Sequence, residues 1–149
     1  MQQTRAFTER SIAIAGLCLA VAMIHVTDQG GFKAMDDPDW LGWAYRALEV
    51  GGALVALVIL FDAVSTRLTG LLLLGLGAGP FVGYILTRTT GLPHDSGDKG
   101  NWNDPLGTMA LIVEGALILI GLMLAARAGE RPGATGSMTA GRTPAHAAS

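Results

Sequence analysis

The sequence contains two matching stretches, LGWAYRALEVGG (residues 41–52) and LGTMALIVEGAL (residues 106–117). Each begins with Leu-Gly and places one glutamate, Glu49 or Glu114, inside a long apolar run. Both runs are long enough to cross a bilayer, where a carboxylate is energetically costly. The two stretches therefore predict membrane-spanning helices, and their glutamates are the first candidates for a functional site.

The composition is typical of an integral membrane protein. Of the 149 residues, 50% are hydrophobic and 15% charged, 21 are glycine, and the mean hydropathy is +0.44. The net charge is −2 and no basic block occurs, so nucleic acid is not an expected partner. The lone Cys18 excludes an intrachain disulfide and is expected to be a small core residue.

Four apolar runs predict an all-α bundle of four transmembrane helices, at about residues 11–27, 40–62, 67–88 and 105–127. About 20 helical residues span roughly 30 Å, the thickness of the hydrocarbon layer. Asp37-Pro38 and Asp104-Pro105 each offer an N-cap followed by proline at the first helical position. The first run could also be a signal peptide, but three more apolar runs and no soluble domain to export favour a retained helix.

Charge divides between the two sides of the predicted bundle. Six arginines lie in the N-terminus (residues 1–10), in the turn at 62–67, and in the end of the fourth run with its tail: Arg5, Arg10, Arg67, Arg127, Arg131 and Arg142. The tail, residues 128–149, is predicted to be disordered. The other two loops and adjacent helix ends hold four basic residues but seven aspartates. By the positive-inside rule both termini are cytoplasmic and the acidic loops face outward, with tryptophans at that outer boundary: Trp40, Trp43 and Trp102.

The two Leu-Gly-x6-Glu stretches also suggest an internal repeat with an offset of 65 residues. The preceding runs correspond loosely, because Gly16 to Gly30 and Gly77 to Gly91 have equal spacing. Two parallel helical hairpins related by an axis along the membrane normal would place Glu49 and Glu114 at like depth and bring them towards each other. Chance similarity is the alternative, since Leu, Gly and Ala are abundant.

Arg46 and Glu49 are three residues apart and share a helix face. We favour a buried ion pair that locks helix packing; alternatively, Arg46 and Arg88 frame an anion or polar headgroup. Glu114 has no basic residue within a turn on its own helix, so its partner must come from another element, or burial keeps it protonated. It is a candidate proton or cation site, or a hydrogen-bonding link to a neighbouring helix.

His25 and Asp28 form a His-x-x-Asp pair at the outer end of the first run. Together with the two glutamates they give a candidate set of divalent-metal ligands: His25, Asp28, Glu49 and Glu114. An amphipathic helix end is the simpler interpretation of His25. The loop at 94–104 lacks the acidic spacing of an EF-hand and is expected to be a solvated loop with turns at its glycines.

A stripe of small residues, Gly75, Gly79 and Gly83, runs along the third predicted helix and includes Pro80, which should kink or loosen that helix. Such a stripe lets a neighbouring backbone approach closely. It predicts close packing inside the bundle or, alternatively, an interface for a homo-oligomer or a larger membrane complex.

Residues Arg88 to Pro93 read Arg-Thr-Thr-Gly-Leu-Pro. This stretch resembles an Arg-Thr-x-Gly-Leu-Pro signature of small, largely uncharacterised bacterial four-helix membrane proteins. Those proteins also tend to have a histidine near the end of the first helix and an acidic residue in the fourth, which His25 and Glu114 match. The resemblance implies a multi-pass protein of the bacterial plasma membrane in which Arg88, Pro93, His25 and Glu114 belong together, and it implies no activity.

The expected site is a polar cluster in the outer half of the bundle, formed by Glu49, Glu114, Arg46, Arg88, His25 and Tyr84. The sequence has no nucleophile triad, phosphate loop, paired cysteines or haem motif, so a binding or accessory protein is favoured over an enzyme. Its ligand would be a small polar molecule, an ion or a lipid headgroup, and no cofactor is indicated. The alternatives are a structural subunit of a larger membrane complex and a small proton-coupled transporter or membrane enzyme.

Overall fold

The computed structural model describes residues 2–31 and 39–129, with side chains from residue 8 onward in the first range and from residue 40 onward in the second. These residues form four α-helices: α1 (Gln2–Asp28), α2 (Asp39–Leu60), α3 (Thr66–Thr89) and α4 (Pro105–Gly129). All four are long and apolar enough to cross a membrane. The predicted helices are confirmed, although α1 begins at Gln2 and so includes most of the predicted polar N-terminus. The predicted Asp37-Pro38 cap and most of the tail lie outside the described residues.

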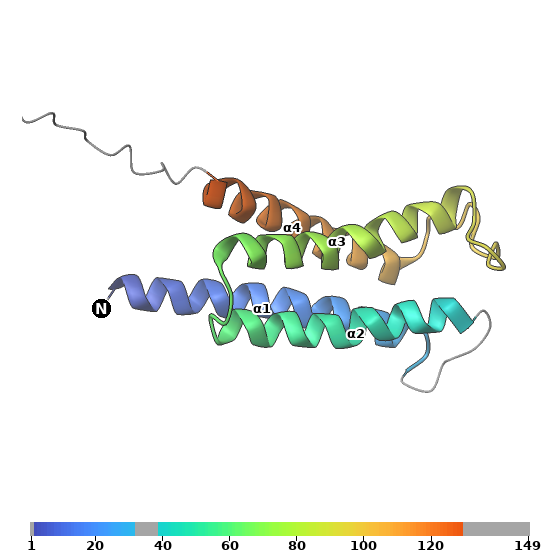
Figure 1. Cartoon of the computed structure of the whole chain (residues 1–149). Helices are drawn as coiled ribbons and strands as arrows, with labels where there is room; N and C mark the ends of the chain where they lie inside the picture. Colours follow the sequence, from blue (N-terminus) through green and yellow to red (C-terminus); the bar gives the residue numbers. More distant parts are fainter. Residues whose placement is uncertain (1, 32–38, 130–149) are drawn as a thin grey trace, which may run out of the picture.

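The four helices form two antiparallel hairpins, as Figure 1 shows: α1 packs on α2, and α3 packs on α4. The two hairpins lie against each other as two layers, with fewer contacts between them than within each. At one end of the bundle α1 and α3 finish and α2 and α4 begin, and the α3–α4 loop lies there too. We call this the acidic end, after four aspartates at the helix ends and in the α3–α4 loop: Asp28, Asp95, Asp98 and Asp104.

Local hydrogen bonds explain where the helices begin and end. The Ser65 hydroxyl accepts from the Leu68 amide at 3.4 Å and caps α3. The Asp104 carboxylate accepts from the Leu106 amide at 3.0 Å, which confirms that Asp104 caps α4 ahead of Pro105. At the other end of α3, Gly91 has φ +79° and its amide donates to the Leu86 carbonyl at 2.8 Å, a glycine-terminated helix end.

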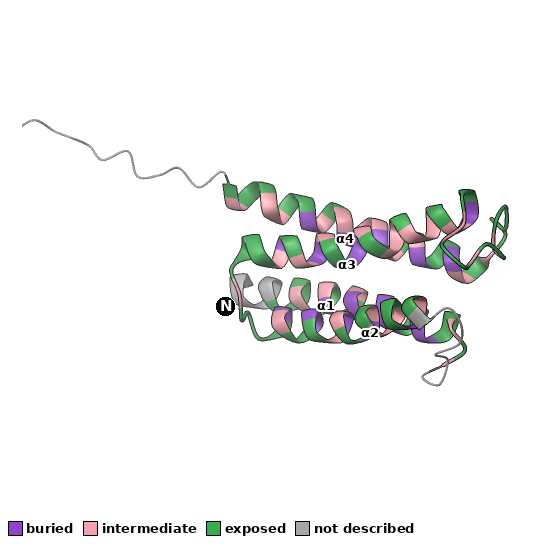
Figure 2. Cartoon of the chain, turned by 45° about the vertical axis from the view of Figure 1, so that its right-hand side comes forward, coloured by how far each residue is buried: buried purple, intermediate pink, exposed green. Residues whose placement is uncertain are grey.

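Glycines set how closely the helices pack. A Cβ built on Gly70 of α3 would lie 2.8 Å from the Gly121 carbonyl oxygen of α4. Gly77 meets the backbone of α4 in the same way, and Gly52 of α2 meets the backbone of α1. These close approaches surround a core that includes Cys18, Leu73 and Leu117, each completely buried. In Figure 2 the buried residues form separate bands along helices whose other residues are intermediate or exposed.

The predicted close packing of the Gly75/Gly79/Gly83 stripe is wrong. A Cβ on any of these three glycines would meet nothing within 4 Å, whereas Gly70, Gly77 and Gly121 contact neighbouring backbone. The stripe and the packing glycines lie on different faces of α3, because the α3 face that meets α4 is the one that carries Gly70, Leu73 and Gly77.

We predict that Gly70→Ala lowers the free energy of unfolding by about 1–3 kcal/mol, because its Cβ must push against backbone atoms of α4. Gly75→Ala is the matched control in the same helix; it meets no clash and should be neutral or stabilising, by up to about 1 kcal/mol from helix propensity. Denaturation of the detergent-solubilised protein followed by circular dichroism measures both. Equal midpoints for Gly70→Ala and the wild type would contradict the packing described.

Candidate functional site

A cavity lies between the two hairpins towards the acidic end, with a volume of about 650 Å³. Ligand sites in proteins commonly have volumes of this size. All four helices and the α3–α4 loop contribute to its wall. Near the middle of α2 and α3 the wall is apolar, formed by residues that include Leu48, Gly51, Leu72, Leu76, Gly79 and Pro80. At the acidic end it is polar.

His25 and Glu114 form the deepest polar group of the cavity wall. Nε2 of His25 on α1 lies 3.1 Å from Oε1 of Glu114 on α4, so this contact joins the two hairpins. Glu114 is 1% exposed. Its second oxygen, Oε2, and Nδ1 of His25 are buried without a hydrogen-bond partner among the described residues. The partner of Glu114 thus comes from another element, which is one of the two alternatives that the sequence left open.

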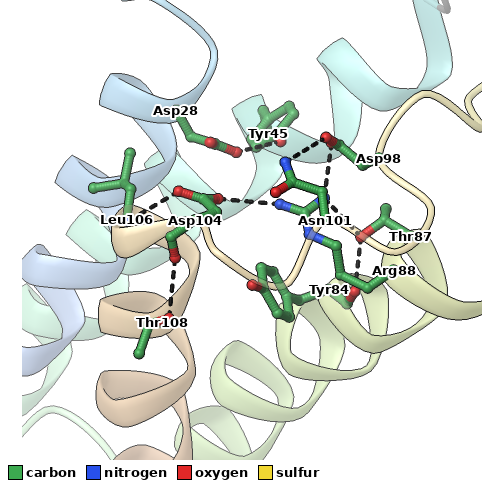
Figure 3. Close-up of polar contacts among 10 residues, drawn as sticks. All are labelled: Asp28, Tyr45, Tyr84, Thr87, Arg88, Asp98, Asn101, Asp104, Leu106 and Thr108. Atoms are coloured by element: carbon green, nitrogen blue, oxygen red, sulfur yellow. Dashed lines mark hydrogen bonds and ion pairs between the residues drawn. The ribbon is translucent and has the colours of Figure 1, made fainter.

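Arg88, at the end of α3, connects that helix to the loop and to α4 (Figure 3). Its guanidinium forms ion pairs with Asp98 at 2.8 Å and with Asp104 at 3.1 Å, and it stacks on the ring of Tyr84, 4.6 Å from the ring centroid. The Arg88 carbonyl accepts from the Gly100 amide at 2.9 Å. Arg88 is 7% exposed, so these carboxylates neutralise a buried charge.

Tyr84 and Trp102 complete the packing of this loop. The two rings meet edge to face with their centroids 6.3 Å apart, and Tyr84 lies against Gly107, where a Cβ would overlap its ring. Across the cavity, the indole of Trp40 donates to the Pro93 carbonyl at 3.2 Å. The α3–α4 loop is therefore tied to α2, α3 and α4 and roofs the cavity.

Asp28 and Tyr45 form the wall on the α1–α2 side. The Tyr45 hydroxyl donates to the Asp28 carboxylate at 2.6 Å, and its ring lies 5.5 Å from that of His25 (centroid to centroid). Both residues line the cavity, as does Asp95 of the loop.

Arg46 and Glu49 form the predicted ion pair, with Nη1 of Arg46 2.7 Å from Oε2 of Glu49. The other Glu49 oxygen accepts from the Gln29 amide nitrogen, so the pair links α2 to the residue that follows α1. Neither Arg46 nor Glu49 lines the cavity. The structure thus brings together four of the six predicted site residues, His25, Tyr84, Arg88 and Glu114, and places Arg46 and Glu49 outside the cavity wall.

Sequence analysis missed the part that the loop plays in this site. Asp98 and Asp104 were expected only as a solvated loop residue and a helix cap. The signal was present, since an arginine at the end of a predicted transmembrane helix calls for counter-charges and an acidic loop follows it directly. Among the described residues, no group of three or more His, Cys, Asp or Glu side chains is arranged to hold a metal ion.

Comparisons with protein-family models, with curated proteins and with solved structures find no match to this chain. Functional inference therefore depends on the cavity and on its residues.

Removing the Arg88 guanidinium should release the roof of the cavity. In Arg88→Gln both ion pairs are lost, and the amides of residues 92–103 should exchange hydrogen at least about tenfold faster, which corresponds to about 1.4 kcal/mol. Arg67→Gln, an exposed arginine at the opposite end, is the control. Hydrogen-exchange mass spectrometry measures the effect; unchanged exchange in Arg88→Gln would show that other contacts hold the loop.

Proposed function

We propose that the chain is a multi-pass membrane protein that binds a ligand in the cavity at its acidic end. The membrane assignment is supported by the four long apolar helices and by large apolar side chains exposed on their outer faces. Ile112 is 68%, Leu119 63% and Met23 59% exposed. In water such surfaces would drive aggregation, whereas lipid chains solvate them.

The orientation that we propose has both termini in the cytoplasm and the acidic end outside. Arg10, Arg67 and Arg127 lie toward the end where α1 begins and α4 finishes, and the four aspartates that define the acidic end lie opposite. The resemblance in residues 88–93 supports a bacterial plasma membrane protein. The internal repeat also remains a proposal, and the two glutamates that suggested it have different partners.

Cysteine labelling tests the orientation. The only native cysteine, Cys18, is completely buried, so the wild type should give little background. A membrane-impermeant maleimide should label Ser96→Cys in intact cells and should label Ala63→Cys only after permeabilisation, because the two exposed positions lie at opposite ends. The reverse pattern would contradict the proposed orientation.

One observation carries the binding role: the wall of the cavity includes residues with buried polar atoms that lack a partner among the described residues, beside apolar surface. Glu114 Oε2 is a buried acceptor without a partner among the described residues, and it belongs to a residue of the cavity wall. Leaving a buried polar atom unpaired costs about 1–3 kcal/mol, which a ligand donor would recover. The apolar part of the wall favours a ligand that also has a hydrocarbon part.

Filling the cavity should remove the ligand. Gly79→Leu adds a side chain where no atom lies within 4 Å of the new Cβ, at a position in the cavity wall. Gly16→Leu is the matched control, because Gly16 is equally unobstructed and does not line the cavity. Mass spectrometry of the proteins purified in mild detergent should find a bound small molecule or lipid in the wild type and in Gly16→Leu, and lose it in Gly79→Leu. Equal content in all three would contradict a ligand in this cavity.

A second candidate role is that of a subunit of a larger membrane complex. Its support is that Gly75 and Gly79 are exposed, so a helix of another chain would fit against this face. The same purification discriminates: a complex that dissociates in Gly79→Leu, with no small molecule lost, favours the subunit role.

A further inference from the structure

The shape of the cavity shows which class of ligand it suits. Its wall between α2 and α3 carries two matching rows of small residues, Ala44, Ala47 and Gly51 on α2 and Gly75, Gly79 and Gly83 on α3. Four of these six residues are exposed, and the two helices share few contacts. Small side chains on both helices leave a slot that opens sideways, toward the lipid in a membrane. A single hydrocarbon chain would fit such a slot, with its polar end directed toward the acidic end.

The charge of the cavity wall indicates which charge the headgroup of such a ligand would have. Five carboxylates line the cavity, on Asp28, Asp95, Asp98, Asp104 and Glu114. The cationic residues of the wall are Arg88 and, when protonated, His25, which leaves three negative charges in excess when all five carboxylates are ionised. Lys99 belongs to the same loop but does not line the cavity. Asp98 and Asp104 hold the two terminal nitrogens of the Arg88 guanidinium, and the Tyr84 ring lies against it. Its buried Nε has no partner among the described residues, so Arg88 keeps one donor for an anion, against five carboxylates in the same wall.

Among the carboxylates of the wall, Glu114 offers a specific oxygen atom that a cationic headgroup could contact. It is 1% exposed, its Oε2 has no partner among the described residues, and it lies in the cavity wall. A buried carboxylate oxygen is best satisfied by a charged donor, because hydrogen bonds between ionised groups are about twice as strong as neutral ones. Asp28 and Asp95 line the same cavity and add to the attraction for a cation.

We propose that the cavity binds a membrane amphiphile whose headgroup carries a protonated amine, with the ammonium group on Glu114 Oε2 and the hydrocarbon chain in the slot between α2 and α3. This inference rests on the proposed function and specifies the ligand of the same cavity. Both parts of the ligand contribute: the chain selects an amphiphile over a soluble amine, and the carboxylates select an amine over an anionic headgroup.

The test uses the purified full chain in neutral detergent micelles and three probes: hexadecylamine, hexadecyl phosphate and butylamine. Native mass spectrometry measures the fraction of protein that carries one probe molecule across a titration. Hexadecylamine should bind in preference to both other probes. Glu114→Gln should weaken its binding at least about tenfold, the loss expected for one partner of a buried charged pair.

Glu49→Gln is the matched control, because Glu49 is also a buried glutamate in a helix but does not line the cavity. It should bind hexadecylamine as the wild type does. If Glu114→Gln does not fold, Asp95→Asn removes another carboxylate of the wall from a half-buried loop position and should still weaken binding several-fold. Unchanged binding in the folded variants, or equal binding of hexadecyl phosphate, overturns the inference.

The outcomes separate this inference from the proposed function. Binding of hexadecyl phosphate that Gly79→Leu abolishes would leave a ligand-binding cavity but reject the cationic headgroup. Binding of butylamine as strong as that of hexadecylamine would reject the hydrocarbon chain as part of the ligand. If no probe binds and no co-purified molecule depends on Gly79, the inference and the proposed function both fail.

Discussion

The close approach of α3 and α4 is the constraint on which the rest of the structure depends. Gly70 and Gly121 bring the two backbones together, and Gly77 does so about two turns further along the same face of α3, where it meets Glu114 and Ile118. This contact fixes the rotation of both helices. It turns the Gly75/Gly79/Gly83 face of α3 away from α4 and towards α2, and it presents Glu114 to α1, where His25 reaches it. The cavity therefore depends on the close contact between α3 and α4 that lies beside it.

Sequence analysis predicted the features that depend on local properties. The length of the apolar runs predicted the four helices, and the Asp104-Pro105 pair predicted the start of α4. The spacing of three residues predicted the ion pair between Arg46 and Glu49. The features it could not predict depend on how the helices rotate about their axes. Nothing local distinguishes Gly75 from Gly77, yet one faces a cavity and the other faces a backbone. Because the rotation of α2 was also unknown from the sequence, only the structure could show that Glu49 lies outside the cavity wall.

The two glutamates show how strongly the surroundings decide what a residue can do. They share a sequence context and both are buried, yet Glu49 has both oxygens engaged, by Arg46 and Gln29, whereas Glu114 has one oxygen engaged and one unpaired. A fully satisfied buried carboxylate stabilises helix packing and has little left to offer a ligand. A buried carboxylate with one unpaired oxygen gains free energy when a donor binds to that oxygen. Glu114 is therefore the residue of the pair that says more about a ligand.

The division into two hairpins has a consequence for how the protein is assembled. Each hairpin consists of helices that are neighbours in the sequence, and most contacts between helices lie within a hairpin. Contacts of this kind form early, because closing a short connection costs little entropy. The cavity needs residues from both hairpins, so it comes into existence only at the docking step, after the helices themselves are in place. A substitution that weakens docking would consequently leave a helical chain without the cavity.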